Sequence, residues 1–171
     1  GHPFTKSMKE TIVGHWHEVE QLSGQRFNYD FDMPRDWIYN TEPACRAAVV
    51  MRNHLGDEVF PFFETLHKAF YRECKDLTDP KVLQELAKLH ELDGDVFMKD
   101  FEDDETKDQT HKDFEFGQRL GLQGFPSIVL RNARGLSLLT SGYQHWEDLF
   151  PTIDSWLESS ELYDSGSRRY R

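Results

Sequence analysis

Residues 120–130 read Leu-Gly-Leu-Gln-Gly-Phe-Pro-Ser-Ile-Val-Leu, and this stretch carries the most specific pattern in the chain. It places a helix end before a Gly-x-x-Gly-aromatic-Pro segment and then continues into a short apolar strand over 126–130. A turn ending in glycine follows at 132–135, and a second strand is predicted over 136–140, so the two strands form a β-hairpin. The apolar spacing of 146–157 predicts a closing helix, in which Pro151 marks either the first turn or a kink.

Helices are predicted throughout the chain before this stretch. Apolar spacing and capping residues place them at 8–22, 42–55, 59–71 and 96–101, from Asp79-Pro80 through Leu89, and from Asp103 or Asp104 to Leu120-Gly121. Gly24 and Gly56 fit helix C-caps, and Pro43 and Pro80 fit first helical turns. The predicted buried faces carry Phe63, Leu66, Ala69 and Phe70 in the third helix and Phe114, Phe116 and Leu120 in the last. Residues 25–41 are predicted to be an irregular loop that lays aromatic rings over a core.

The composition excludes several classes of function. The 171 residues hold 20 Lys and Arg against 31 Asp and Glu, a formal net charge of −11. A nucleic-acid groove or an anionic membrane surface needs dense positive charge, so neither is expected as a partner. No apolar stretch is long enough for a transmembrane helix. The length suits one domain, or one domain with an inserted subdomain.

The cysteines and histidines match no metal-binding or disulfide pattern. Cys45 and Cys74 are the two cysteines, they form no C-x-x-C pair, and each is expected to be a small buried apolar side chain. His15 and His17 are two residues apart and so lie on different sides of a helix. The acidic run at 100–105 lacks the glycine of a calcium loop and fits a solvated helix junction. We therefore expect no metal site.

Three further segments extend the pattern of residues 120–130. Residues 39–47 read Tyr-Asn-Thr-Glu-Pro-Ala-Cys-Arg-Ala, residues 69–73 read Ala-Phe-Tyr-Arg-Glu, and residues 77–83 read Leu-Thr-Asp-Pro-Lys-Val-Leu. Together, and in this order, they resemble the DsbA-like branch of the thioredoxin superfamily, near the FrnE-type and 2-hydroxychromene-2-carboxylate isomerase-like proteins. The resemblance implies an α/β fold that is mostly helical here. It divides the chain into a helical insertion subdomain over 6–120, the C-terminal half of a thioredoxin-like domain over 121–160, and a flexible tail over 161–171.

The same resemblance locates a substrate-binding loop at Gly124, Phe125, Pro126 and Ser127. In the family this loop faces the catalytic cysteines and begins with a cis-proline, so the Phe125–Pro126 bond is expected to be cis. X-Pro bonds reach the cis state far more easily than other peptide bonds. The backbone N–H and C=O of Phe125 are then presented to an extended peptide, as in strand addition.

The chain departs from the family pattern at its start. It begins Gly1-His2-Pro3 without an initiating Met, and it has no strand–Cys-x-x-Cys–helix unit before Met8. We therefore expect a start that is not native and about one βαβ unit, roughly 30 residues, to be missing. The resemblance implies that the full-length form is a thiol–disulfide oxidoreductase. We expect no catalytic residue, metal or cofactor within these 171 residues, and we expect them to be inactive alone.

Two alternatives remain at this point. One is an isomerase or transferase that uses bound glutathione, and the other is a non-catalytic interaction module. The expected partners are a protein or small thiol or disulfide substrate. A lone hairpin has open edges, so a second copy of the chain is also expected to cover them. The resemblance to the FrnE-like branch implies a cytoplasmic location.

Overall fold

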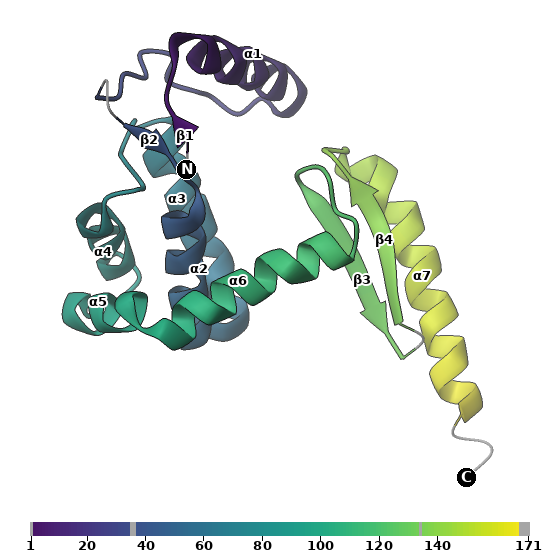
Figure 1. The fold of residues 1–171 in the computed structure, drawn as a ribbon. Helices are drawn as coiled ribbons and strands as arrows, with labels where there is room; N and C mark the ends of the chain where they lie inside the picture. The colour runs from purple at the N-terminus through teal and green to yellow at the C-terminus, as the bar shows by residue number, and fades with distance from the viewer. Residues whose placement is uncertain (1, 35–36, 134, 168–171) are drawn as a thin grey trace. The chain divides into compact units, whose positions relative to one another are not determined.

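The chain folds into two compact units, Gly1–Asp113 and Phe114–Arg171, in a computed structural model that describes residues 2–34, 37–133 and 135–167 (Figure 1). The unit boundary lies inside helix α6 (Asp104–Arg119), whereas the sequence predicted a division between residues 120 and 121. Thr106 and Thr110 in the first two turns of α6 are buried, and no later residue of that helix is. The first turns of α6 therefore belong with the helices that precede them.

The first unit is built almost entirely from helices (Figure 1). These are α1 (Lys6–Ser23), α2 (Glu42–Leu55), the short 3-10 helix η1 (Gly56–Val59), α3 (Phe60–Tyr71), α4 (Pro80–Lys88) and α5 (Gly94–Glu102). The predicted capping residues are confirmed: Gly24 ends α1 with φ of 70°, and the Asp79 side chain accepts a hydrogen bond from the Lys81 N–H at the start of α4. Local sequence thus sets where α1 ends and where α4 begins.

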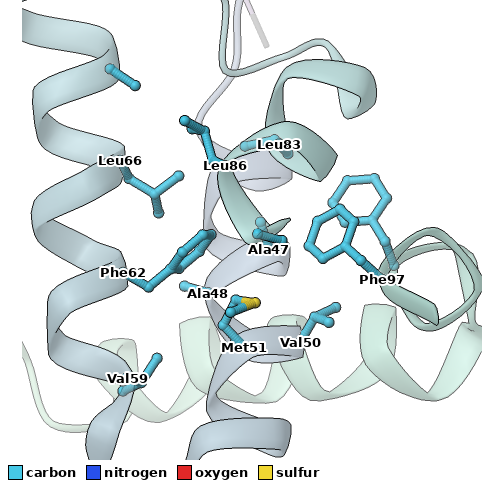
Figure 2. Packing of buried hydrophobic residues seen from close by; sticks show 13 residues of the cluster. Ala47, Ala48, Val50, Met51, Val59, Phe62, Leu66, Leu83, Leu86 and Phe97 are labelled. Carbon is cyan, nitrogen blue, oxygen red and sulfur yellow. The ribbon is translucent and has the colours of Figure 1, made fainter. Parts of the chain in front are cut away.

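One apolar core joins α2, η1, α3, α4 and α5, and we call it the helical core. Its buried members are Ala47, Ala48, Val50, Met51, Val59, Phe62, Leu66, Ala69, Leu83, Leu86, Ala87, Phe97 and Phe101. Figure 2 shows Phe62 and Leu66 of α3 directed toward Ala48 and Met51 of α2 and Leu86 of α4. Two alanines on α2 let its backbone approach its neighbours closely, while the rings fill the remaining space.

Some predicted buried positions are wrong. In α3 the fully buried ring is Phe62, and the neighbouring Phe63 is 38% exposed. In α6, Phe114 and Phe116 are exposed, at 38% and 48%. In α3 the sequence offers two adjacent apolar residues on different sides of the helix, whereas in α6 no residue after Thr110 is buried on any side. The side that becomes buried is decided by the position of the neighbouring helices, which apolar spacing does not give.

A second cluster, the aromatic cluster, forms around the segment between α1 and α2. Trp16, Phe31 and Trp37 are buried, and the rings of Phe4, Phe27, Tyr29, Tyr39, Phe70 and Tyr71 pack around them. The prediction that residues 25–41 lay rings over a core is therefore confirmed. This segment also holds an unpredicted strand, β2 (Ile38–Tyr39), which pairs antiparallel with β1 (His2–Pro3). Two-residue strands leave no periodic signal in a sequence.

The second unit consists of the end of α6, a hairpin and a final helix. Strands β3 (Ser127–Asn132) and β4 (Gly135–Ser141) pair antiparallel, as predicted, with an irregularity between Ile128 and Val129. Helix α7 (Trp146–Ser167) contacts β4 and contains Pro151 within its length. The sequence predicted that this helix ends at Leu157, but it continues to Ser167 and so includes residues 161–167 of the predicted flexible tail. Residues 168–171 of that tail lie outside the described residues. Over the described residues, no helix is both long and apolar enough to span a membrane.

Candidate functional site

Helix α6 ends in a capping motif that lies directly before the candidate loop. The Gly121 N–H donates to the Gln118 carbonyl at 2.9 Å, and the Leu122 N–H donates to the Gly117 carbonyl at 3.1 Å. Gly121 has φ of 69°, which a residue with a side chain rarely adopts. These two hydrogen bonds and the left-handed glycine make a Schellman motif, so the helix end predicted at Leu120-Gly121 is confirmed.

The four predicted site residues form one turn directly before β3, and we call them the 124–127 loop. The peptide bond between Phe125 and Pro126 is cis. The Ser127 hydroxyl donates to the Gly124 carbonyl at 2.6 Å and closes the turn from inside. The structure thus places Gly124, Phe125, Pro126 and Ser127 together at the start of a strand, where the sequence predicted them.

Phe125 is the most exposed large apolar side chain of the described residues, with 94% of its surface accessible. Among the hydrogen bonds of the described residues, none uses its backbone N–H or C=O. Within the same residues β3 pairs with β4 alone, so the other edge of β3 carries no neighbouring strand there. Exposed backbone groups and an open strand edge are what an extended peptide needs in order to add to a sheet.

The loop is held by Thr140 and Gly142, at and just beyond the end of the strand that the sequence predicted over 136–140. The Gly142 N–H donates to the Pro126 carbonyl at 2.8 Å, and the Thr140 hydroxyl donates to the Gly142 carbonyl at 2.9 Å. A Cβ at Gly124 would come within 3.4 Å of the Ser141 hydroxyl, so the two segments lie in contact. The Ser141-Gly142 pair is a local signal for the end of a strand, but its contact with Pro126 depends on the pairing of β3 with β4.

Both cysteines lie in the first unit and are free thiols of intermediate exposure. Burial raises the pKa of the Cys45 thiol, and the carboxylates of Glu42 and Asp113 raise it further. Burial also raises the pKa of Cys74, with Asp30 acting in the same direction and Lys9 against it. A raised pKa keeps a thiol protonated at neutral pH, and the protonated form is a poor nucleophile.

His54 and acidic residues of the 100–105 run have structural partners. The His54 ring lies 2.7 Å from an Asp100 carboxylate oxygen, and the Asp103 carboxylate accepts from the Glu105 N–H at the start of α6. The acidic run at 100–105 therefore serves as a helix junction, as predicted. In the part of the chain that the structure describes, no three His, Cys, Asp or Glu residues are grouped to hold a metal ion.

Known proteins similar to this chain share its fold over most of its length. Residues 6–153 match the DSBA-like thioredoxin domain. The crystal structure of a "putative protein disulfide isomerase" from Nitrosomonas europaea is 33% identical with a TM-score of 0.88, covering 93% of this chain and 78% of that one. The cytosolic disulfide reductase DsbM from Pseudomonas aeruginosa is 21% identical with a TM-score of 0.74, covering 92% of this chain and 80% of DsbM. The DsbM structure with GSH gives a TM-score of 0.72. No match is found among the curated proteins.

Proposed function

Because this chain belongs to the family of DSBA-like thioredoxin domains, we propose that it serves thiol–disulfide exchange and that its 124–127 loop binds the substrate. The substrate is a protein or a small molecule that carries a thiol or a disulfide. The chain contributes the surface that holds this substrate in an extended form beside the reacting sulfur atoms.

The observation that carries this proposal is the state of Phe125. Its ring is 94% exposed, and its backbone N–H and C=O have no hydrogen-bond partner among the described residues. Two further contacts, from Ser127 to Gly124 and from Gly142 to Pro126, fix the turn on both sides of it. A turn held this firmly loses little conformational entropy when a peptide pairs with it, which favours binding.

The chain's own cysteines do not suit the reacting role. In thiol–disulfide exchange a thiolate attacks one sulfur of a disulfide, a new S–S bond forms, and the other sulfur leaves as a thiolate. The pKa values of Cys45 and Cys74 are both raised, which lowers the fraction of thiolate available for attack. We therefore assign substrate binding to the 124–127 loop and assign no exchange step to these two thiols.

A peptide-binding measurement tests the assignment of the loop. The probe is a fluorescently labelled, extended peptide whose single cysteine is blocked as a methyl disulfide, followed by anisotropy. Replacing Phe125 by Ala removes the exposed ring and should weaken binding about fivefold, a typical loss for one partly exposed contact. The matched control is Phe116→Ala, which removes a ring that is 48% exposed in the same unit but outside the loop. Equal effects of the two substitutions would remove the basis for the proposal.

A turnover measurement tests the assignment of the cysteines. In an insulin-reduction assay with dithiothreitol, the 171-residue chain should give no rate above the uncatalysed one. A Cys45→Ser, Cys74→Ser double variant should behave identically. Turnover that disappears in the double variant would show that these thiols do react and that the assignment is wrong.

A further inference from the structure

A pocket of about 460 Å³ opens in the first unit, and neither cysteine is among the residues that line it. Its walls come from the segment after α1 and from the end of α3: Arg26, Phe27, Asn28, Tyr29, Asp30 and Arg72. We call it the arginine pocket. It combines two guanidinium groups with two aromatic rings.

Arg72 is fixed at the pocket wall by neutral partners. Its Nε donates to the Arg26 carbonyl at 3.3 Å, and its Nη2 donates to the Gln25 side-chain oxygen at 2.8 Å. The Asn28 side chain donates to the Arg72 carbonyl at 3.3 Å, and the Asn28 N–H donates to the Tyr71 carbonyl at 2.8 Å. Because a guanidinium has five N–H donors, this anchoring leaves others for a ligand.

The two arginines are unusual in their electrostatic setting. Residues 1–113 contain 24 Asp and Glu against 14 Lys and Arg, so acidic partners are plentiful in this unit. None of the ion pairs within the described residues nevertheless includes Arg26 or Arg72. Two unpaired guanidinium groups lining one pocket attract an anion and can bind a carboxylate through paired N–H donors.

The rings beside the arginines are held in place by the aromatic cluster. Phe27 stacks on Trp16 with centroids 5.6 Å apart. Tyr29 stacks on His17 at 4.1 Å, and its hydroxyl donates to a Glu20 carboxylate oxygen at 2.6 Å. Rings with fixed positions give an apolar wall that costs little entropy to use.

We propose that the arginine pocket binds a small organic monocarboxylate with an apolar body. The carboxylate is bound by Arg26 and Arg72, and the apolar body packs on Phe27 and Tyr29. Asp30 lines the same pocket and adds a negative charge, which disfavours a second carboxylate or a phosphate dianion. This site is independent of the substrate loop proposed above.

The test titrates 3-phenylpropionate into the 171-residue chain and follows the amide resonances by NMR. Its neutral amide, 3-phenylpropanamide, and inorganic phosphate are titrated in parallel. The carboxylate should bind about tenfold more tightly than the amide, the effect of one charge-assisted hydrogen bond. The shifted resonances should include those of residues 26–30. Equal affinity for the amide, or phosphate bound as tightly as the carboxylate, would overturn the proposal.

Substitutions complete the test. Arg26 donates none of the side-chain hydrogen bonds of the described residues, so Arg26→Gln should preserve the fold and weaken 3-phenylpropionate about fivefold. The matched control is Arg52→Gln, which removes a guanidinium paired with Asp113 at 2.8 Å on the surface of the same unit. Asp30→Asn should increase the affinity for phosphate. An affinity for the carboxylate that is the same in Arg26→Gln as in Arg52→Gln would refute the site.

Discussion

Replacement of Asp76 by Ala should destabilise the first unit more than the partial exposure of this side chain suggests. One carboxylate oxygen of Asp76 accepts three hydrogen bonds: from the Trp37 indole N–H at 2.9 Å, from the Thr78 N–H at 2.8 Å and from the Thr78 hydroxyl at 2.6 Å. Trp37 is 7% exposed and packs in the aromatic cluster. This single oxygen therefore connects the loop before α2 to the turn before α4.

The expected loss follows from which donors can reach water afterwards. The buried Trp37 N–H would lose its acceptor, which costs about 1–3 kcal/mol for a buried group left unpaired. Thr78 is partly exposed and can donate to water, so the loss of its turn contacts should cost about 1 kcal/mol. We expect Asp76→Ala to lower the free energy of unfolding by about 2–4 kcal/mol. Asp76→Asn keeps an acceptor oxygen in place and should cost about 1 kcal/mol.

Urea denaturation followed by tryptophan fluorescence measures these changes. The control is Asp108→Ala, an exposed aspartate in α6, which should change stability by less than about 0.5 kcal/mol. A double-mutant cycle with Trp37→Phe separates the indole contact from the turn, because the two losses should overlap by about 1–2 kcal/mol. An Asp76→Ala loss no greater than that of Asp108→Ala would refute the reasoning.

Three further predictions concern titration, thiol reactivity and association. Burial and the hydrogen bond to Glu20 raise the pKa of Tyr29 to about 12, so the tyrosinate absorbance that Tyr29→Phe removes should develop above pH 10. Because the pKa of Tyr29 is higher in the folded than in the unfolded chain, its contribution to the free energy of unfolding is complete below pH 10 and is lost as pH rises toward 12. A Tyr29 that titrates near pH 10, as a free tyrosine does, would contradict this. The raised pKa values of Cys45 and Cys74 predict that iodoacetamide alkylates both thiols more slowly at neutral pH than it alkylates free cysteine, and rapid reaction of either single Ser variant would be contrary evidence. We also propose that a second copy of the chain covers the hairpin, because Leu138 is 57% exposed and residues 114–171 are nearly neutral, with 7 acidic and 6 basic residues. Sedimentation should show a dimer that the Leu138→Glu substitution dissociates. A monomeric parent chain would exclude this dimer.

The sequence determined those features whose causes lie within a few neighbouring residues. Asp79-Pro80 begins α4 and Gly121 ends α6 because capping hydrogen bonds and a left-handed glycine act within one helical turn. The 124–127 loop is equally local, since its proline and its closing Ser127 hydrogen bond span four consecutive residues. The family pattern could therefore be recognised from short segments in the right order.

The tertiary structure decided what depends on residues far apart in the chain. Phe62, and not Phe63, is buried because the positions of α2 and α4 select one side of α3. Trp37 meets Asp76 across 39 residues, and Arg72, which lines the arginine pocket, meets Gln25 across 47. Local propensity and apolar spacing describe single segments, whereas these contacts exist only after several helices have packed around one core.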